Sequence, residues 1–117
     1  MNSYYLMDTS TDYSYLLDAM EIFMKDLLPR HKTLDISIEV KDTLDYGAEG
    51  YTENLDDLSK PKEFLISLSL KSKDIIRTLA HECIHVAQYV RTGDYDENDA
   101  YANELELSRK YKNDTTN

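Results

Sequence analysis

Apolar residues recur along this chain with two different periods, and each period predicts a different kind of element. Between residues 10 and 28 they return every three or four positions, which is typical of an amphipathic helix. The apolar positions of this segment are Tyr13, Leu16, Leu17, Met20, Phe23, Met24 and Leu27. Pro29 follows them directly, so we expect the helix to end just before it.

Alternation of apolar and polar residues predicts strands in the middle of the chain. Residues 34–40 alternate strictly and residues 64–70 largely do, which is the pattern of a strand with one buried face. Residues 46–60 contain two glycines and several acidic residues, so we expect a hairpin or loop there. A short strand near Tyr51 fits this segment.

Helical spacing returns in the last third of the chain. Ser72 is a plausible N-cap, Asp74 suits a first helical turn, and Gly93 marks the C-terminal stop. A last helix is predicted over about residues 96–111, followed by a polar tail from about residue 112 that we expect to be frayed. The predicted fold is therefore α+β, with an N-terminal helix, a small three- or four-stranded sheet and two further helices.

Composition limits the classes of function that fit this fold. The length of 117 residues suits a single domain spanning 1–117. Thirteen basic residues against 23 acidic ones give a net charge of −10, which disfavours direct binding to nucleic acid or anionic membranes. The chain shows no signal-peptide pattern and no apolar run of membrane-spanning length. With a single cysteine, Cys83, a cytoplasmic location is the default expectation.

Residues 81–85 read His-Glu-Cys-Ile-His, a match to the H-E-x-x-H pattern of zinc peptidases. Positions i and i+4 lie one turn apart on a helix, so the imidazoles of His81 and His85 can reach one cation. Glu82 lies about 100° round the helix, close enough to act on water beside the metal without binding the metal itself. The spacing therefore predicts a zinc site with Glu82 as general base.

The other residues of this helix also divide into a polar arc and an apolar arc. Thr78, Glu82, His85 and Tyr89 fall on the side of His81. Apolar residues occupy the opposite arc: Ile75, Ile76, Leu79, Cys83, Val86, Ala87 and Val90. We therefore expect this arc to be buried, with Cys83 as a core thiol, and the histidines to face outward from the core.

Catalytic zinc needs a third protein ligand, which the motif does not supply. His31 is the one remaining histidine, and its place at a helix end favours a surface partner of the helix dipole. Arg91 stands where an extended motif would have a third histidine. A carboxylate of the last helix is therefore needed. A tight antiparallel helix pair would bring Glu104 to the metal, whereas a steep crossing would bring Glu97.

His81-Glu82-Cys83-Ile84-His85, with a carboxylate on the next helix, resembles the gluzincin clan of metallopeptidases. Small, including phage-encoded, members are similar to this chain over about residues 10–110 and have a zincin-like fold. Minimal gluzincins place alanine three residues after the ligand glutamate, as in Glu97-Asn98-Asp99-Ala100, which implies Glu97. Larger gluzincins carry an Asn-Glu pair, as in Asn103-Glu104, which implies Glu104.

The resemblance implies a Zn²⁺ cofactor and a peptide or protein substrate. It also implies that the strand ending near Leu70 lies beside the metal at the edge of the sheet. The oxyanion formed during hydrolysis needs a donor besides the metal, and Tyr89, Tyr95 or Tyr101 could supply it.

Two other functions compete with a zinc metallopeptidase. The chain could be a catalytically silent zinc-binding domain that recruits a partner. It could also be an acidic interaction protein that imitates DNA and carries the motif incidentally. Metal content and the effect of replacing Glu82 discriminate among the three, whereas the sequence does not indicate the oligomeric state.

Overall fold

The fold is α+β, with a four-stranded sheet and three helices in the part of the chain that is described. The computed structural model describes residues 2–7, 13–31, 33–56, 58–59 and 61–116. The elements in chain order are β1 (Ser3–Leu6), α1 (Tyr15–Leu27), β2 (Asp35–Lys41), the short 3-10 helix η2 (Asp45–Gly47), β3 (Gly50–Asn54), β4 (Glu63–Ser69), α2 (Ile75–Thr92) and α3 (Glu97–Thr116). The predicted strands and helices are all present.

The sheet has the strand order β1-β2-β4-β3, and its two edges differ in direction. The strands β1, β2 and β4 run parallel, whereas β3 pairs antiparallel with β4. The strand β4, expected at the edge, is therefore interior, and β3 forms the edge. The prediction about the edge strand was wrong because β4 pairs with β2 on one side and with β3 on the other.

The strand β1 was not predicted, because four residues are too few to show a period. Its backbone pairs with β2 in the register Tyr4↔Ile36. Asn2 fastens this strand from its end, since its side chain accepts a hydrogen bond from the backbone of Leu34 at 2.8 Å and donates one to the carbonyl of His31 at 2.9 Å. Tertiary pairing therefore creates this element.

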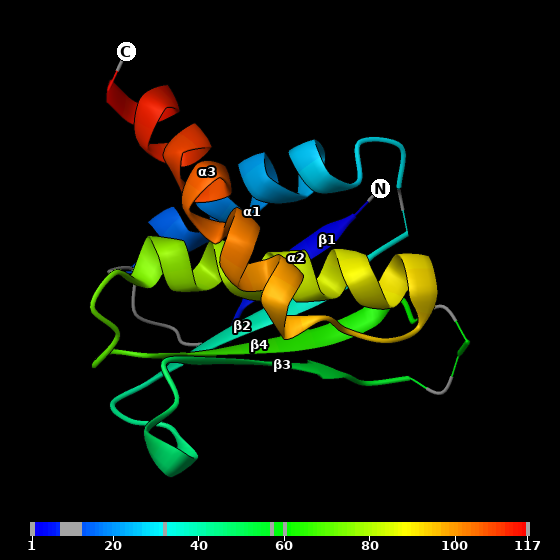
Figure 1. The fold of residues 1–117 in the computed structure, drawn as a ribbon, viewed down its shortest axis with the longest axis horizontal. Helices are drawn as coiled ribbons and strands as arrows, with labels where there is room; N and C mark the ends of the chain where they lie inside the picture. The colour runs from blue at the N-terminus through cyan, green and yellow to red at the C-terminus, as the bar shows by residue number, and fades with distance from the viewer. Residues whose placement is uncertain (1, 8–12, 32, 57, 60, 117) are drawn as a thin grey trace.

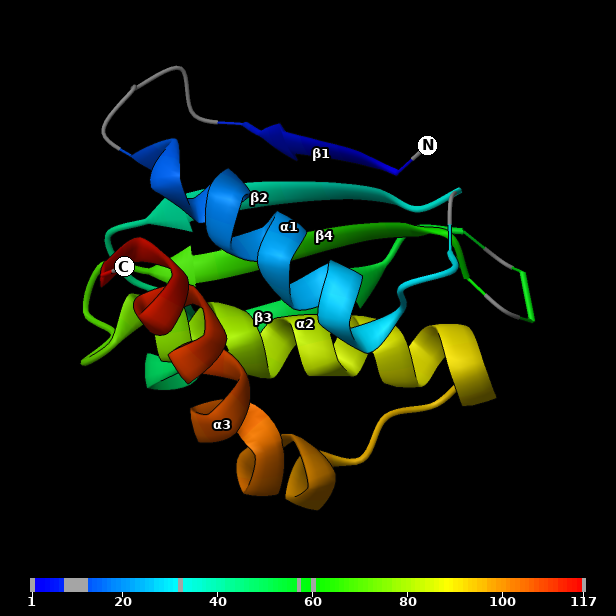
Figure 2. The same ribbon diagram turned by 90° about the horizontal axis from the view of Figure 1, so that it is seen from above.

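All three helices lie on one side of the sheet (Figure 1). The helix α1 contacts β1, the helix α2 contacts β3 and β4, and α3 packs on both helices. Seen from above, α3 crosses α2 obliquely and does not run alongside it (Figure 2). The core between helices and sheet contains Leu16, Met20, Phe23, Ile36, Ile38, Phe64, Ile66, Leu68, Leu79 and Val86, all fully buried.

The helix ends differ from the predictions in three respects. The predicted start of α1 near residue 10 lies outside the described residues, and the described helix begins at Tyr15. The N-cap of α2 is Asp74, whose carboxylate accepts a hydrogen bond from the backbone of Arg77 at 3.1 Å, while the Ser72 hydroxyl bonds to that of Thr78 instead. The expected frayed tail is helical, because α3 continues to Thr116.

The other end of α2 agrees with the prediction. Gly93 adopts a left-handed conformation with φ of 79°, which ends the helix at low cost because glycine has no Cβ. None of the described helices is long and apolar enough to cross a membrane.

Candidate metal centre

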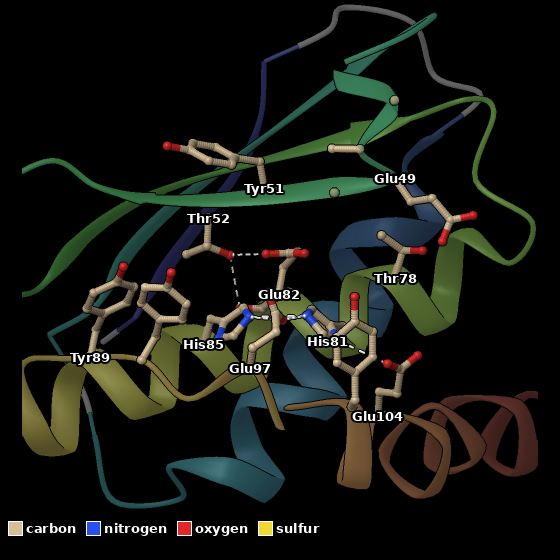
Figure 3. Close-up of a pocket in the computed structure, with 15 residues that line it drawn as sticks. Glu49, Tyr51, Thr52, Thr78, His81, Glu82, His85, Tyr89, Glu97 and Glu104 are labelled. Carbon is tan, nitrogen blue, oxygen red and sulfur yellow. Dashed lines mark hydrogen bonds and ion pairs between the residues drawn. The ribbon is translucent and has the colours of Figure 1, made fainter. Parts of the chain in front are cut away.

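His81, Glu82 and His85 lie in the middle of α2, under the crossing of α3 and beside the edge strand β3 (Figure 3). The arc of α2 that carries them was expected to face outward. All three residues are nevertheless less than a tenth exposed. The side chains point into a cleft and away from the hydrophobic core, as expected, but α3 and β3 cover this polar side of the helix. Both sides of α2 are therefore buried, and a cleft of about 500 Å³ gives access to the polar one.

Three ligand atoms converge at the floor of this cleft. The Nε2 atoms of His81 and His85 are 3.1 Å apart, and the Oε1 atom of Glu97 lies 2.5 Å from the first and 2.9 Å from the second. These three residues form a group whose ligand atoms all lie within 4.8 Å of one another, so it could hold a metal ion.

The opposite ring nitrogens of the two histidines have acceptors of their own. The Nδ1 atom of His81 is 3.1 Å from Oε1 of Glu104, and the Nδ1 atom of His85 is 2.9 Å from Oε1 of Gln88. Because both partners are oxygen acceptors, each Nδ1 carries a proton, and each neutral ring presents a lone pair at Nε2. Two lone pairs and a carboxylate oxygen this close repel one another unless a proton or a cation lies between them.

Gln88 owes its orientation to α3. Its amide nitrogen donates to the carbonyl of Asp96 at 2.9 Å and to Oδ2 of Asp99 at 2.8 Å. Its amide oxygen also accepts from the backbone nitrogen of Asp96 at 2.8 Å. Two acceptors on one side and two donors on the other leave a single consistent orientation, with the oxygen toward His85.

Glu97 and Glu104 take different positions around the same histidine. Glu97 is in the first turn of α3 and reaches the Nε2 atoms, with half of its side chain exposed. Glu104 reaches the other side of the His81 ring and is 10% exposed, with its second oxygen 2.6 Å from Nε of Arg77. The steep crossing considered above therefore applies, and Glu97 is the carboxylate that joins the cluster. Its role as a metal ligand stays a prediction.

Glu82 is held on the β3 side of the cleft. Its Oε1 atom accepts a hydrogen bond from the hydroxyl of Thr52 at 2.6 Å. The close approach of the strand depends on Gly50, because a Cβ added there would lie 2.6 Å from Cγ2 of Thr78 and 2.9 Å from Oε2 of Glu82. A larger residue would force the strand or the side chains of Thr78 and Glu82 to move.

The surroundings of Glu82 and Glu97 shift the pKa values of the two carboxyl groups in opposite directions. Burial raises the pKa of Glu82, and the hydrogen bond from Thr52 and the nearby histidines only partly oppose this. Burial would also raise the pKa of Glu97, but its contacts with the Nε2 atoms of His85 and His81 outweigh it and lower the pKa, which requires a proton between these atoms when no metal is bound. One carboxyl group thus favours a proton and the other favours its charge.

The three tyrosines considered as oxyanion donors all line the cleft. The ring of Tyr101 lies 4.7 Å from that of His81, and the ring of Tyr95 meets that of His85 edge-on at 5.3 Å, both between centroids. The Tyr89 ring is 6.0 Å from that of Tyr95. The structure therefore brings all three near the cluster, and no single one is selected.

Cys83 and His31, which were not expected to bind the metal, are absent from the group of possible ligands. Cys83 is fully buried in the core, as predicted, and burial raises the pKa of its thiol. His31 follows α1 but is half-buried rather than on the surface, and its Nε2 atom has no hydrogen-bond partner among the described residues.

Sequence reasoning missed three residues that act around the histidines: Arg77, Gln88 and Thr52. Arg77 and Gln88 precede or follow the motif at helical spacings that place them within about 40° of His81, so the helical wheel could have found them. Thr52 could not be found that way, because its contact with Glu82 joins residues 30 positions apart.

No protein-family model, curated protein or solved structure matches this chain. Its function is therefore inferred from the geometry of the centre alone.

Proposed function

We propose that this protein is a zinc-dependent metallopeptidase with a zincin-like fold, in which His81, His85 and Glu97 hold the metal and Glu82 is the general base. The observation that carries the proposal is the convergence of two Nε2 atoms and one carboxylate oxygen beside a second carboxyl group, that of Glu82, which Thr52 holds separately. The order of elements supports it as well, since an antiparallel edge strand, the motif helix and a ligand helix surround the site.

The donor set fits zinc in type and number. Two imidazoles and one carboxylate are the ligands of many catalytic zinc sites, which keep one position open for water or substrate. Hydrogen bonds from Nδ1 to Glu104 and to Gln88 give the ring tautomer that a metal requires. Glu104 is in turn oriented by Arg77, so the support extends outward from the ligands.

When bound, zinc supplies Lewis-acid chemistry, which lowers the pKa of water toward neutrality and polarises a peptide carbonyl. The side chains divide the remaining work. Glu82 accepts the proton of the attacking water and passes it to the leaving amine, a task for which a raised pKa is suited. Thr52 holds the Glu82 carboxylate in place. A phenol from Tyr89, Tyr95 or Tyr101 donates to the developing oxyanion.

Replacing Glu82 with glutamine tests the proposal. Elemental analysis of the purified native protein is expected to find about one zinc per chain, and Glu82→Gln should retain it because Glu82 is not a ligand. Hydrolysis of a peptide mixture, followed by mass spectrometry, should fall by roughly 10²- to 10⁴-fold in Glu82→Gln, the usual contribution of a general base. Glu106→Gln, an exposed glutamate of α3, is the matched control and should behave like the parent.

Each alternative has its own outcome. Zinc without any Glu82-dependent hydrolysis would identify a catalytically silent zinc-binding domain. A chain that purifies without zinc and is unchanged by chelation would contradict the metal centre and favour an acidic interaction protein.

A further inference from the structure

The walls of the cleft are acidic and phenolic. The carboxylates that line it are Glu49, Glu82, Glu97 and Glu104, and the phenols beside the cluster are Tyr89, Tyr95 and Tyr101. Among the described residues, no lysine or arginine lines it. A ligand of this cleft therefore meets negative charge and aromatic rings with no fixed side-chain cation in between.

Most of these carboxylates are already occupied. Glu104 is paired with Arg77, Glu82 accepts from Thr52, and Glu97 faces the ring nitrogens of the histidines. A bound zinc ion would further offset the charges of Glu82 and Glu97. The negative charge available to a ligand must therefore come from elsewhere on the wall.

Glu49 supplies that charge. Its side chain is exposed and accepts one hydrogen bond, from the backbone nitrogen of Lys73 at 3.2 Å. It forms no ion pair with any residue in the described part of the chain. Figure 3 shows Glu49 and Tyr89 at opposite ends of the residues that line the cleft. Glu49 and Tyr89 therefore lie on either side of the candidate metal centre.

The phenols offer a second means of holding a cation. Tyr95 and Tyr101 are each more than half exposed, although each ring also contacts a histidine ring. An exposed aromatic face attracts the side chain of lysine or arginine through a cation–π interaction worth about 0.5–1 kcal/mol. The carboxylate of Glu49 and the exposed phenols therefore both favour a positively charged ligand.

From this wall chemistry we propose that the cleft selects a cationic peptide segment, so that the substrate is a lysine- or arginine-rich stretch of a protein. The inference rests on the proposed function and names its substrate class. Glu49 pairs with one basic side chain of the segment, and the exposed phenols pack on another. The net charge of −10 raises the concentration of such segments around the molecule and steers them toward it.

Binding of three labelled peptides of equal length tests this proposal. One carries lysines and arginines, and the other two carry glutamine or glutamate at the same positions. Their affinities are measured by fluorescence anisotropy on the full-length, zinc-treated Glu82→Gln chain, so that no peptide is consumed. The basic peptide is expected to bind at least about tenfold tighter than the glutamine peptide, with the difference shrinking at high ionic strength.

Charge reversals at two positions separate local recognition from overall charge. Glu49→Lys should weaken binding of the basic peptide by about tenfold and leave that of the glutamine peptide unchanged, because one contact with a cation is reversed. Glu21→Lys is the matched control, an exposed glutamate of α1 that does not line the cleft, and its effect should stay below about twofold. Tyr101→Leu should weaken binding of the basic peptide by about two- to fivefold.

The proposal is overturned if the three peptides bind equally, if none binds, or if Glu21→Lys is as harmful as Glu49→Lys. Its failure is distinguishable from failure of the proposed function. Zinc-dependent hydrolysis that cuts the glutamine peptide as well as the basic one would contradict only the cationic selectivity. A zinc-free chain that still prefers the basic peptide through Glu49 would contradict only the metallopeptidase.

Discussion

The two sides of α2 are both closed to water, but different forces close them. On the apolar side Leu79, Cys83 and Val86 are fully buried by packing. On the polar side His81 and His85 are almost as buried, but hydrogen bonds to Glu104 and Gln88 hold their rings in place. Exposure alone would class both sides as core.

The two sides of α2 differ in how their burial contributes to folding stability. Apolar burial stabilises by roughly 25 cal/mol per Å² removed from water. Burying a polar group is unfavourable unless every donor and acceptor is paired, and converging lone pairs remain unfavourable even then. On the polar side of α2 the Nδ1 atoms of both histidines have partners, but their Nε2 atoms and the Glu97 oxygen repel one another unless a proton or a cation lies between them. This arrangement does not favour stability and therefore indicates a function. The comparison predicts that mutations on the two sides have separable effects.

Truncation on the apolar side should produce the largest change in stability. Leu79→Ala removes a fully buried side chain from the core between the helices and the sheet and should lower the free energy of unfolding by about 2–5 kcal/mol. Urea denaturation in the presence of a chelator measures it. Zinc affinity of the folded protein should be unchanged, and Leu105→Ala, at a partly exposed position, should cost far less. An equal loss of zinc affinity would mean that the two sides are not separable.

Loss of one hydrogen-bonding partner on the polar side should act on metal affinity instead. Gln88→Ala removes the acceptor of the His85 Nδ1 proton, so the ring can adopt the wrong tautomer, and zinc should bind about 10- to 100-fold more weakly. Competition with a chromophoric chelator measures the change. Asn98→Ala, at an exposed position of α3, serves as the control. An affinity within twofold of the parent would leave Gln88 with a purely structural role.

The smallest expected effect is a pH dependence of the metal-free protein. Burial raises the pKa of Glu82 in the folded state, so the folded chain binds this proton more tightly than the unfolded chain. The stability it contributes is present below the unfolded pKa of about 4.3 and is lost as pH rises through the folded value. Each tenfold difference in proton affinity is worth about 1.4 kcal/mol.

The glutamine of Glu82→Gln does not titrate, so the stability of this variant relative to the parent should increase between pH 4 and pH 7. Thermal denaturation of both chains in a chelator across this range measures the difference. A relative stability that is constant with pH would show that Glu82 titrates normally. Glu106→Gln should show no such trend, since that glutamate is exposed.

Much of the fold followed from local patterns, and the two failures in the sheet share one cause. The strands β2 and β4 and the stop at Gly93 follow from period and turn chemistry that act over a few residues. The strand β1 and the edge position of β3 depend on pairing between distant segments. The N-cap was assigned to Ser72 because its hydroxyl was plausible, but that hydroxyl is engaged by Thr78.

The candidate site divides in the same way. Helical geometry by itself places His81, Glu82 and His85 on one side of α2, because the positions of neighbours one turn apart are set by the backbone. The choice between Glu97 and Glu104 was left open, since it depends on how two helices cross. Both carboxylates turn out to contact His81, one on each side of its ring.

The amino-acid sequence determined which residue types share a helix side, where the strands β2 and β4 and the stop at Gly93 fall, and the acidity of the whole chain. Only the tertiary structure decided that the polar side is buried, that Glu97 joins the two Nε2 atoms across 16 positions of sequence, and that Thr52 reaches Glu82 from the edge strand. Local geometry is encoded within a few residues, whereas contacts between elements depend on the packing of the entire core.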